Sequence, residues 1–387
     1  MADDLLDLKH PVFICDVRSD NEFRRWKLAF THGTEAVNLP YFLLLEEGGS
    51  DDIVECVKAC QAKNLFRALP LDKQILTVCA KGGTADLIAE GLRECGYQAV
   101  NLKGGMQAWG AYYRVQPVNR GIWQVSRPAR GCLSYIVESC GEVAIIDPLR
   151  DSDKYLTFIR QRGLKLNFIL DTHGHADHIS GGPRMAELSG APYFLHPYDA
   201  IHPIDLLPAA ITYSPLYDNV ELTLGNVKLR ALHIPGHTLG NTALLLDQDY
   251  LFSGDSIFLS SVSRPDLGGR GESWAALHRS SLQKLLGLPG NIHVLPGHYS
   301  DADEPREDGV FIKSLESLRG KNEGLDLACR SQQEFVAEIM KNLPSFPPEY
   351  IEIKRVNLGL SVPEEEQVAE LELGKNLCAV GGSKSAR

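Results

Sequence analysis

The sequence has no apolar run of the length, about 18 residues or more, that a membrane-spanning helix requires. Its first residues, MADDLLDLKHPVF, also lack the basic stretch followed by an apolar segment that marks a secretory signal peptide. Positive charge is scarce: 39 lysines and arginines stand against 50 aspartates and glutamates, for a net charge of −11. Such an acidic chain is not expected to bind nucleic acid or an anionic membrane surface. We therefore expect a cytoplasmic protein with neither partner.

A disulfide framework is absent as well. The nine cysteines are odd in number and widely scattered, without the regular spacing of a disulfide-rich domain. The contents of 44% hydrophobic and 23% charged residues are those of a globular protein, and 387 residues are enough for two domains. No feature of the sequence fixes the oligomeric state, so a homo-oligomer remains open.

Residues 1–114 alternate short apolar strands with helical stretches. The runs VFICDV and QILTVCA are continuous apolar segments, as buried parallel strands are. The segment ADLIAEGLRECGY between later strands has helical spacing and a glycine, Gly96, suited to a helix C-terminus. This alternation predicts an α/β domain with a parallel sheet.

The pattern changes after residues 115–123, which suit either a linker or an entering edge strand. In residues 124–325, CLSYIVESCGEVAIIDP predicts two strands around a tight turn at Gly141, and LNFILDT predicts another strand. These residues form the expected second domain. Residues 326–387 form a C-terminal extension with a helix, SQQEFVAEIMKNL, and an end, GGSKSAR, expected to be disordered.

The stretch VCAKGGTAD places Cys79 between an apolar strand and a helix. Backbone amides and the positive end of the helix dipole would stabilise a thiolate there, which makes it a nucleophile. The glycines allow the backbone to curl around the sulfur. A buried core cysteine followed by a glycine turn is the alternative. The residues of this loop, called here the cysteine loop, are Cys79, Ala80, Lys81, Gly82, Gly83 and Thr84.

This loop resembles the active-site loop of rhodanese-like sulfurtransferases, Cys-Arg-Lys-Gly-x-Thr-Ala. CDVRSDNEF and GYQAVNLKGGMQAW resemble two further motifs of that family, so the resemblance extends over nearly all of residues 1–114. It implies that Cys79 carries a persulfide held by Lys81 and the loop amides. Ala80 replaces the usual arginine. The sulfur donor is therefore not expected to be thiosulfate by resemblance alone. We expect Arg18 of the Asp-Val-Arg motif to be a structural ion-pair partner.

Histidines and aspartates recur where strands of the second domain end. DTHGHADHISGG contains three histidines and two aspartates, and IPGHTLGNT, LFSGDS and VLPGHYS add one residue each. Residues two apart in an extended segment face the same way, which would bring the first two histidines together. Imidazole and carboxylate together suit zinc, iron or manganese. The candidate ligands are His173, His175, Asp177, His178, His237, Asp255 and His298.

The order of these ligands resembles that of the metallo-β-lactamase fold superfamily over residues 120–300. This resemblance implies an αββα sandwich whose metals lie at one edge of the sheets. Many members hold two zinc ions with all seven residues, and Asp255 would then bridge them. Such a site activates a bound water for hydrolysis.

GDSIFLSSVSRPDLGG resembles the corresponding segment of the persulfide dioxygenase branch. That resemblance implies one Fe(II) per chain, held by His173, His237 and Asp255, with open positions for O₂ and a sulfur substrate. The remaining four candidates, His175, Asp177, His178 and His298, would orient the ligands or hold a second metal. Arg264 would hold a substrate carboxylate, or have a structural role. Pro265 replaces the threonine of that branch, and Tyr299 stands where aspartate is common.

The two resemblances together imply oxidation of a small thiol persulfide to sulfite with O₂, coupled to transfer of sulfane sulfur through Cys79, with thiosulfate as the other sulfur species. The rhodanese-like half stands first here, whereas the compared fusions have it last. A zinc thioester hydrolase with one or two zinc ions is the alternative, favoured by the complete ligand set. A sulfur carrier or persulfide sensor with a degenerate metal domain is a third hypothesis, against which the intact ligands count.

Overall fold

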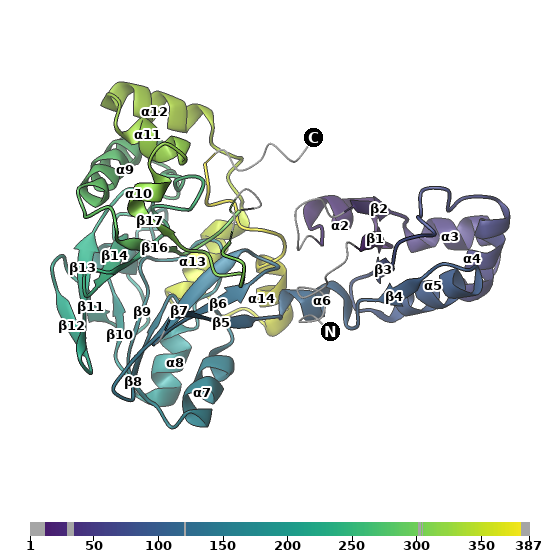
Figure 1. The fold of residues 1–387 in the computed structure, drawn as a ribbon, viewed down its shortest axis with the longest axis horizontal. Coiled ribbons are helices and arrows are strands. Elements are labelled where there is room, and N and C mark those ends of the chain that lie inside the picture. The colour runs from purple at the N-terminus through teal and green to yellow at the C-terminus, as the bar shows by residue number, and fades with distance from the viewer. Residues whose placement is uncertain (1–11, 29–34, 120, 301–302, 304, 381–387) are drawn as a thin grey trace. The chain divides into compact units, whose positions relative to one another are not determined.

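The structure, a computed structural model, describes residues 12–28, 35–119, 121–300, 303 and 305–380. The chain divides into two compact units. The first unit comprises the described residues up to Arg114 with two short later segments, Arg127–Arg130 and Leu373–Lys375, and the second unit comprises the remainder. Figure 1 shows the first unit mainly in purple and dark blue and the second in colours from blue to yellow.

The first unit is built on a four-stranded sheet with the strand order β2-β1-β3-β4, in which each neighbouring pair is parallel. Every residue of β1 and β3 is buried. Side chains of the helices α4 and α5 fill one apolar cluster, and Trp26, Met106 and Trp109 belong to another. The predicted parallel α/β domain is therefore confirmed. Its elements are β1 (Phe13–Asp16), α2 (Asp20–Arg25), β2 (Glu35–Asn38), α3 (Tyr41–Gly48), α4 (Ile53–Ala62), β3 (Ile75–Val78), α5 (Gly83–Glu94), β4 (Ala99–Asn101) and α6 (Gly105–Gly110).

The Asp-Val-Arg sequence at the end of β1 forms a buried ion pair. Arg18 Nη2 donates to Asp16 Oδ2 at 2.6 Å, and Arg18 Nε donates to Asp16 Oδ1 at 3.0 Å. The same Nη2 donates to the backbone oxygen of Trp26. A guanidinium engaged in this way cannot reach a substrate, so the predicted structural role of Arg18 is confirmed.

The second unit consists of two sheets that pack face to face. A seven-stranded sheet has the order β11-β10-β9-β8-β7-β6-β5, and a six-stranded sheet has the order β12-β13-β14-β15-β16-β17. Side chains of both sheets share one apolar core, in which the rings of Tyr135 and Phe252 lie 5.1 Å apart. Helices α7 and α8 lie outside the first sheet, and α9 with its neighbours α11 and α12 lies outside the second (Figure 1). The predicted αββα sandwich is therefore confirmed.

The elements of this unit follow in chain order. The strands are β5 (Arg114–Asn119), β6 (Ile122–Arg127), β7 (Cys132–Ser139), β8 (Glu142–Ile146), β9 (Lys165–Leu170), β10 (Tyr193–Leu195), β11 (Ser214–Pro215), β12 (Glu221–Leu224), β13 (Val227–His233), β14 (Thr242–Leu246), β15 (Tyr250–Gly254), β16 (His293–Pro296) and β17 (Lys313–Ser314). The helices are α7 (Ser152–Gln161), α8 (Gly182–Ser189), the 3₁₀ helix η1 (Pro197–Ala200), α9 (Gly271–Leu286), α10 (Leu315–Leu318), α11 (Glu323–Ala328), α12 (Gln332–Lys341), α13 (Glu349–Asn357) and α14 (Glu365–Leu371).

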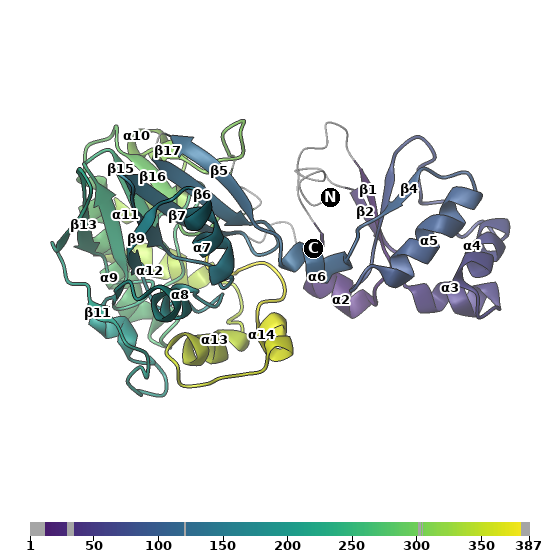
Figure 2. The same cartoon turned by 90° about the horizontal axis from the view of Figure 1, so that it is seen from below.

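Residues 115–123, for which a linker and an edge strand were both open, form most of β5 and the beginning of β6, and β5 is the edge strand of its sheet. Residues 326–372 belong to the second unit and do not form a unit of their own. Their helices α13 and α14 lie side by side (Figure 2). The final GGSKSAR segment lies outside the described residues.

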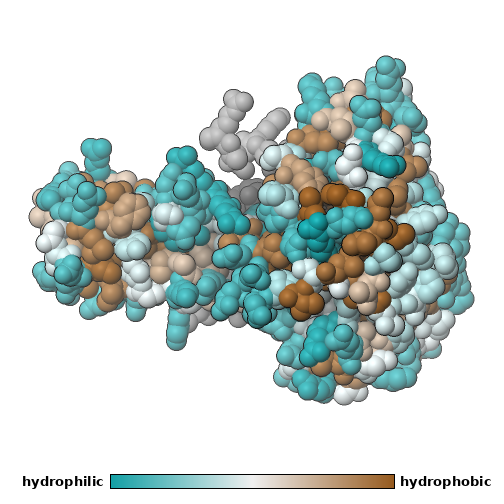
Figure 3. Space-filling model, turned by 180° about the vertical axis from the view of Figure 1, so that it is seen from behind, coloured by the Kyte–Doolittle hydropathy of each residue, from teal (hydrophilic) through white to brown (hydrophobic). Residues whose placement is uncertain are grey.

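The described surface mixes apolar with polar groups, and the face in Figure 3 shows both kinds on each unit. Tyr198 and Leu206 are among the exposed large hydrophobic residues of the second unit. None of the helices in the described part of the chain is long and apolar enough to span a membrane.

A glycine pair in the first unit makes room for the cysteine loop, which yields a stability prediction. Gly105 has φ +60°, and a Cβ there would overlap the backbone oxygen of Cys79. We expect Gly105→Ala to destabilise this unit by about 3 kcal/mol or more. Gly96→Ala is the matched control: Gly96 has φ +91° and open space around it, so only about 1–2 kcal/mol of backbone strain is expected. Hydrogen–deuterium exchange of the β3 and α5 amides measures both, and equal losses would contradict the packing argument.

Candidate metal centre and cysteine loop

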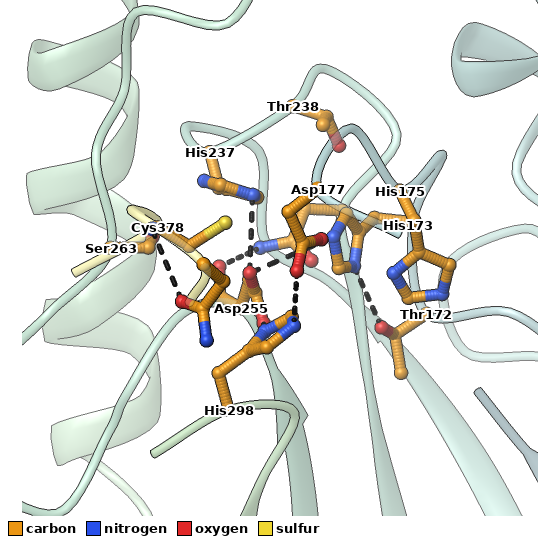
Figure 4. Close-up of polar contacts among 12 residues, drawn as sticks. Thr172, His173, His175, Asp177, His237, Thr238, Asp255, Ser263, His298 and Cys378 are labelled. Carbon is orange, nitrogen blue, oxygen red and sulfur yellow. Dashed lines mark hydrogen bonds and ion pairs between the residues drawn. The ribbon is translucent and has the colours of Figure 1, made fainter. Parts of the chain in front are cut away.

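Seven candidate ligands come from loops that follow strands of both sheets. His173, His175, Asp177 and His178 follow β9, His237 follows β13, Asp255 follows β15 and His298 follows β16. All seven side chains are almost completely buried. Figure 4 labels six of them, all but His178; five lie close together, and His175 lies to one side. The strand ends thus collect the candidate residues at one edge of the sandwich, as the sequence predicts.

His173, His237 and Asp255 form one compact group. His237 Nε2 lies 3.4 Å from Asp255 Oδ2, and His173 Nε2 lies 3.9 Å from the same oxygen. The three ligand atoms lie within 4.8 Å of one another. Two imidazoles and one carboxylate arranged in this way could hold a single divalent metal ion.

The hydrogen bonds of these residues leave the inward atoms available. His237 Nδ1 lies 2.7 Å from the backbone oxygen of Arg264. Because a carbonyl oxygen only accepts, Nδ1 must carry the proton, and the lone pair of the neutral ring is on Nε2. His173 Nδ1 lies 2.9 Å from the hydroxyl of Thr172. Both Nε2 atoms and Asp255 Oδ2 are buried and make no hydrogen bond within the described structure. Burial, with neighbouring imidazoles, holds the pKa of His173 well below its usual range, and burial lowers the pKa of His237. Neutral imidazoles with unused lone pairs fit a bound cation.

A second group adjoins the first through His298. His298 Nδ1 lies 2.5 Å from Asp255 Oδ1, and His298 Nε2 lies 2.7 Å from Asp177 Oδ2. His178 Nδ1 lies 3.1 Å from Asp177 Oδ1. Cys132, which the sequence did not single out, has its sulfur 3.6 Å from Asp177 Oδ2. The second group consists of Cys132, Asp177, His178 and His298, whose ligand atoms lie within 4.8 Å of one another. This group could orient the residues of the first group or hold a second ion.

His175 is directed away from His237. Its ring centroid lies 4.2 Å from that of His173, but its Nε2 lies 3.3 Å from Asp147 Oδ1 and 3.6 Å from Asp171 Oδ1. The expectation that His173 and His175 converge on one ion therefore does not hold for their ligand atoms. The reason is local: residues 173–175 lie in a loop beyond β9, where the side-chain alternation of a strand does not apply.

One aspartate, which no sequence motif singles out, joins two of the ligand loops. Asp199, from the 3₁₀ helix η1, accepts hydrogen bonds from Gly174 N at 2.8 Å, Thr238 Oγ1 at 2.6 Å and Gly240 N at 2.8 Å. These three groups flank His173 and His237 in the sequence. The buried amine of Lys354 donates to the backbone oxygen of Gly174 at 2.6 Å, so both backbone polar groups of Gly174 are held. Asp199 therefore positions the loops rather than contacting a metal itself.

We expect Asp199→Ala to weaken metal binding by about 10- to 100-fold, the range found for residues that orient metal ligands. Asp205→Ala is the control, because Asp205 is close to Asp199 in the sequence but pairs with Arg355. Competition with a chelator during metal titration measures the affinity of each variant. Unchanged affinity in Asp199→Ala would show that the loops keep their places without this carboxylate.

The C-terminal extension braces the histidine loop. Asn357 Nδ2 donates to the backbone oxygens of His175 and His178, each at 2.9 Å. Asn357 Oδ1 accepts from Ser180 N at 2.9 Å, and Glu372 Oε1 accepts from Ile179 N at 2.9 Å. These contacts join positions almost two hundred residues apart, which no local sequence pattern indicates.

Arg264 is a correction to the substrate-binding hypothesis. Its side chain is fully buried and pairs with Asp266 through Nε at 2.7 Å and Nη2 at 2.9 Å. Further donors reach the backbone oxygens of Pro344 at 3.0 Å and Leu377 at 3.1 Å. The guanidinium is therefore committed to fastening the C-terminal extension, and the structural alternative applies instead of a substrate contact.

In the first unit, the cysteine loop connects β3 to α5. Gly82 N donates to Cys79 Sγ at 3.0 Å, with Gly82 at φ +94°. Asn101 Nδ2 holds the Gly82 oxygen at 3.0 Å. Ala80, Lys81 and Gly83 are exposed and Thr84 is half-buried. A backbone amide aimed at the sulfur ahead of a helix can stabilise a thiolate or a persulfide anion.

Comparison with known proteins agrees with this division. Residues 127–298 match the metallo-beta-lactamase superfamily, and residues 1–112 match the rhodanese-like domain. A hydroxyacylglutathione hydrolase of Methylococcus capsulatus is 30% identical over 61% of this chain and 90% of its own length. A beta-lactamase hydrolase-like protein of Xylella fastidiosa is 30% identical over 62% of this chain, which spans 60% of that protein. A metallo-beta-lactamase crystal structure from Staphylococcus aureus superposes with a TM-score of 0.54 at 25% identity, covering 65% of this chain and 74% of that chain.

Proposed function

The chain belongs to the metallo-beta-lactamase superfamily and carries a rhodanese-like domain before it, and we propose that it oxidises a low-molecular-weight thiol persulfide. Glutathione persulfide is the substrate that we would test first. The reaction is R–S–SH + O₂ + H₂O → R–SH + SO₃²⁻ + 2 H⁺. The terminal sulfur is oxidised to sulfite, and O₂ accepts the electrons.

The observation that carries this proposal is the group of His173, His237 and Asp255. Two imidazoles and one carboxylate form the ligand set of non-haem iron sites that react with O₂, and the three inward atoms make no hydrogen bond within the described chain. The direction of His175 toward Asp147 also favours a set of three over a set that includes it. Ferrous iron held there would supply the redox chemistry by which O₂ oxidises sulfur. The chain's own part is to hold the ligand geometry and shield the site from water, which the complete burial of these side chains favours.

The cysteine loop would use the sulfite formed in this reaction. Cys79 would attack the terminal sulfur of a second persulfide, forming a Cys79 persulfide and releasing R–SH. Sulfite would then attack the outer sulfur of Cys79, giving thiosulfate and regenerating the thiolate. The Gly82 amide, 3.0 Å from the sulfur, supports this role because it can stabilise the anion before and after transfer.

A dinuclear zinc thioester hydrolase is the second candidate. It is favoured by the group of Asp177, His178 and His298, which adjoins the first group through Asp255, and by the similarity to the Methylococcus capsulatus hydrolase. In that case the two groups would hold two ions and activate water for attack on a thioester.

The two candidates are separated by loading the metal-free protein with Fe(II) or with Zn(II) and giving each form both substrates. We expect the iron form to consume O₂ with glutathione persulfide, and the zinc form to show little hydrolysis of S-lactoylglutathione. Rapid hydrolysis by the zinc form, with no O₂ uptake by the iron form, would reverse the assignment.

A further inference from the structure

A cysteine of the C-terminal extension lies beside the metal-ligand groups. The segment around Cys378 runs antiparallel to the residues that follow Asp255: Arg264 N donates to the Cys378 oxygen at 2.8 Å, and Val380 N donates to the Val262 oxygen at 2.9 Å. A bridge between Ser263 and Ala379 lies between these bonds. The backbone of Cys378 is therefore fixed against the segment that leaves the Asp255 loop.

The side chain of Cys378 is directed into the cluster. Its sulfur and the ligand atoms of Asp177, Asp255 and His298 all lie within 4.8 Å of one another, and Figure 4 shows the sulfur among these residues. Cys378 is fully buried. Tyr350 fixes the position of Cys378. Its hydroxyl lies 3.8 Å from the Cys378 sulfur and accepts a hydrogen bond from Leu377 N at 2.8 Å.

The chemistry of this neighbourhood favours a cation. A thiol, two carboxylates and an imidazole meet out of contact with water, and Asp255 Oδ2 makes no hydrogen bond within the described residues. Carboxylates brought together without water are costly unless a positive charge joins them. Thiolate, imidazole and carboxylate are together a common donor set for zinc and related metals.

We propose that Cys378 is a thiolate ligand of the metal centre, supplied by the C-terminal extension. Neither of the two resemblances implies a ligand from this part of the chain. The ligand applies to iron and zinc alike and does not depend on which reaction the protein catalyses. It would make the extension part of the metal centre, and removing the extension would then expose and weaken the site.

The experiment is X-ray absorption at the zinc edge of the zinc-loaded full-length protein, compared with two serine variants. A sulfur ligand gives a shell at about 2.3 Å, separate from nitrogen and oxygen shells at about 2.0–2.1 Å. We expect the sulfur shell in the natural protein and in Cys132→Ser, and its loss in Cys378→Ser. Cys132 is the matched control because it too is a buried cysteine near these ligands.

Absence of the sulfur shell from the natural protein overturns the proposal, and so does a shell that Cys132→Ser loses and Cys378→Ser keeps. If Cys378→Ser does not fold, as near-ultraviolet circular dichroism would reveal, the natural protein and Cys132→Ser still decide. A sulfur shell that survives in Cys132→Ser supports Cys378, and one that disappears there contradicts it.

Discussion

Replacing Asp255 with alanine is expected to remove the metal from the second unit and to end persulfide oxidation. Asp255 supplies the one carboxylate of the group with His173 and His237, and its other oxygen lies 2.5 Å from His298 Nδ1. The substitution therefore removes one candidate ligand of the first group and the contact through which the second group adjoins it. Residues that merely orient ligands are worth about 10- to 100-fold in metal affinity, so loss of this ligand should cost more than that.

The matched control is Asp249→Ala, the same substitution at an exposed side chain next to the same strand. Metal content after dialysis against a chelator and O₂ uptake with glutathione persulfide are measured for both variants. We expect Asp249→Ala to keep both properties and Asp255→Ala to lose both. An Asp255→Ala protein that retains a full complement of metal would contradict the ligand assignment.

Replacing Cys79 with serine is expected to abolish sulfur transfer to sulfite while leaving O₂ uptake intact. A serine hydroxyl fits the same space but does not ionise near neutral pH and cannot carry a persulfide. Because Cys79 lies in the first unit and the candidate metal ligands lie in the second, the two half-reactions should be separable by single substitutions.

Thiosulfate formed from glutathione persulfide and sulfite measures the transfer, and intact mass after persulfide treatment reveals whether an extra sulfur atom is carried. Cys95→Ser, a change of a half-buried cysteine in the same unit, is the control and should behave as the natural protein does. Thiosulfate formation that persists in Cys79→Ser would mean that the cysteine loop is not the carrier.

The elements and many of the site positions could be predicted because they depend on local pattern. The apolar runs gave β1 and β3, and the turn at Gly141 joins β7 to β8 as expected. Ligands at strand ends were recognisable since a strand ending in a histidine or aspartate followed by small residues is a local signal. The structure brings His173, His237 and Asp255 within reach of one another, as this rule predicts.

The remainder depends on contacts between distant parts of the chain. Asp199 and Asn357 fasten the ligand loops from positions that have no distinctive local sequence. Arg264 lies in the segment after Asp255, and this position suggested a substrate contact. In the structure its guanidinium instead pairs with Asp266, two residues later. Cys378 belongs to an extension whose place against the 262–264 segment only the three-dimensional structure reveals.

The most direct test of the proposed reaction is O₂ uptake by the iron-loaded protein on addition of glutathione persulfide, with sulfite measured in the same sample. The proposal predicts one O₂ consumed for each sulfite formed in Cys79→Ser, in which no sulfite is converted to thiosulfate. No uptake by protein shown to hold iron, or equal uptake by Asp255→Ala, would contradict it.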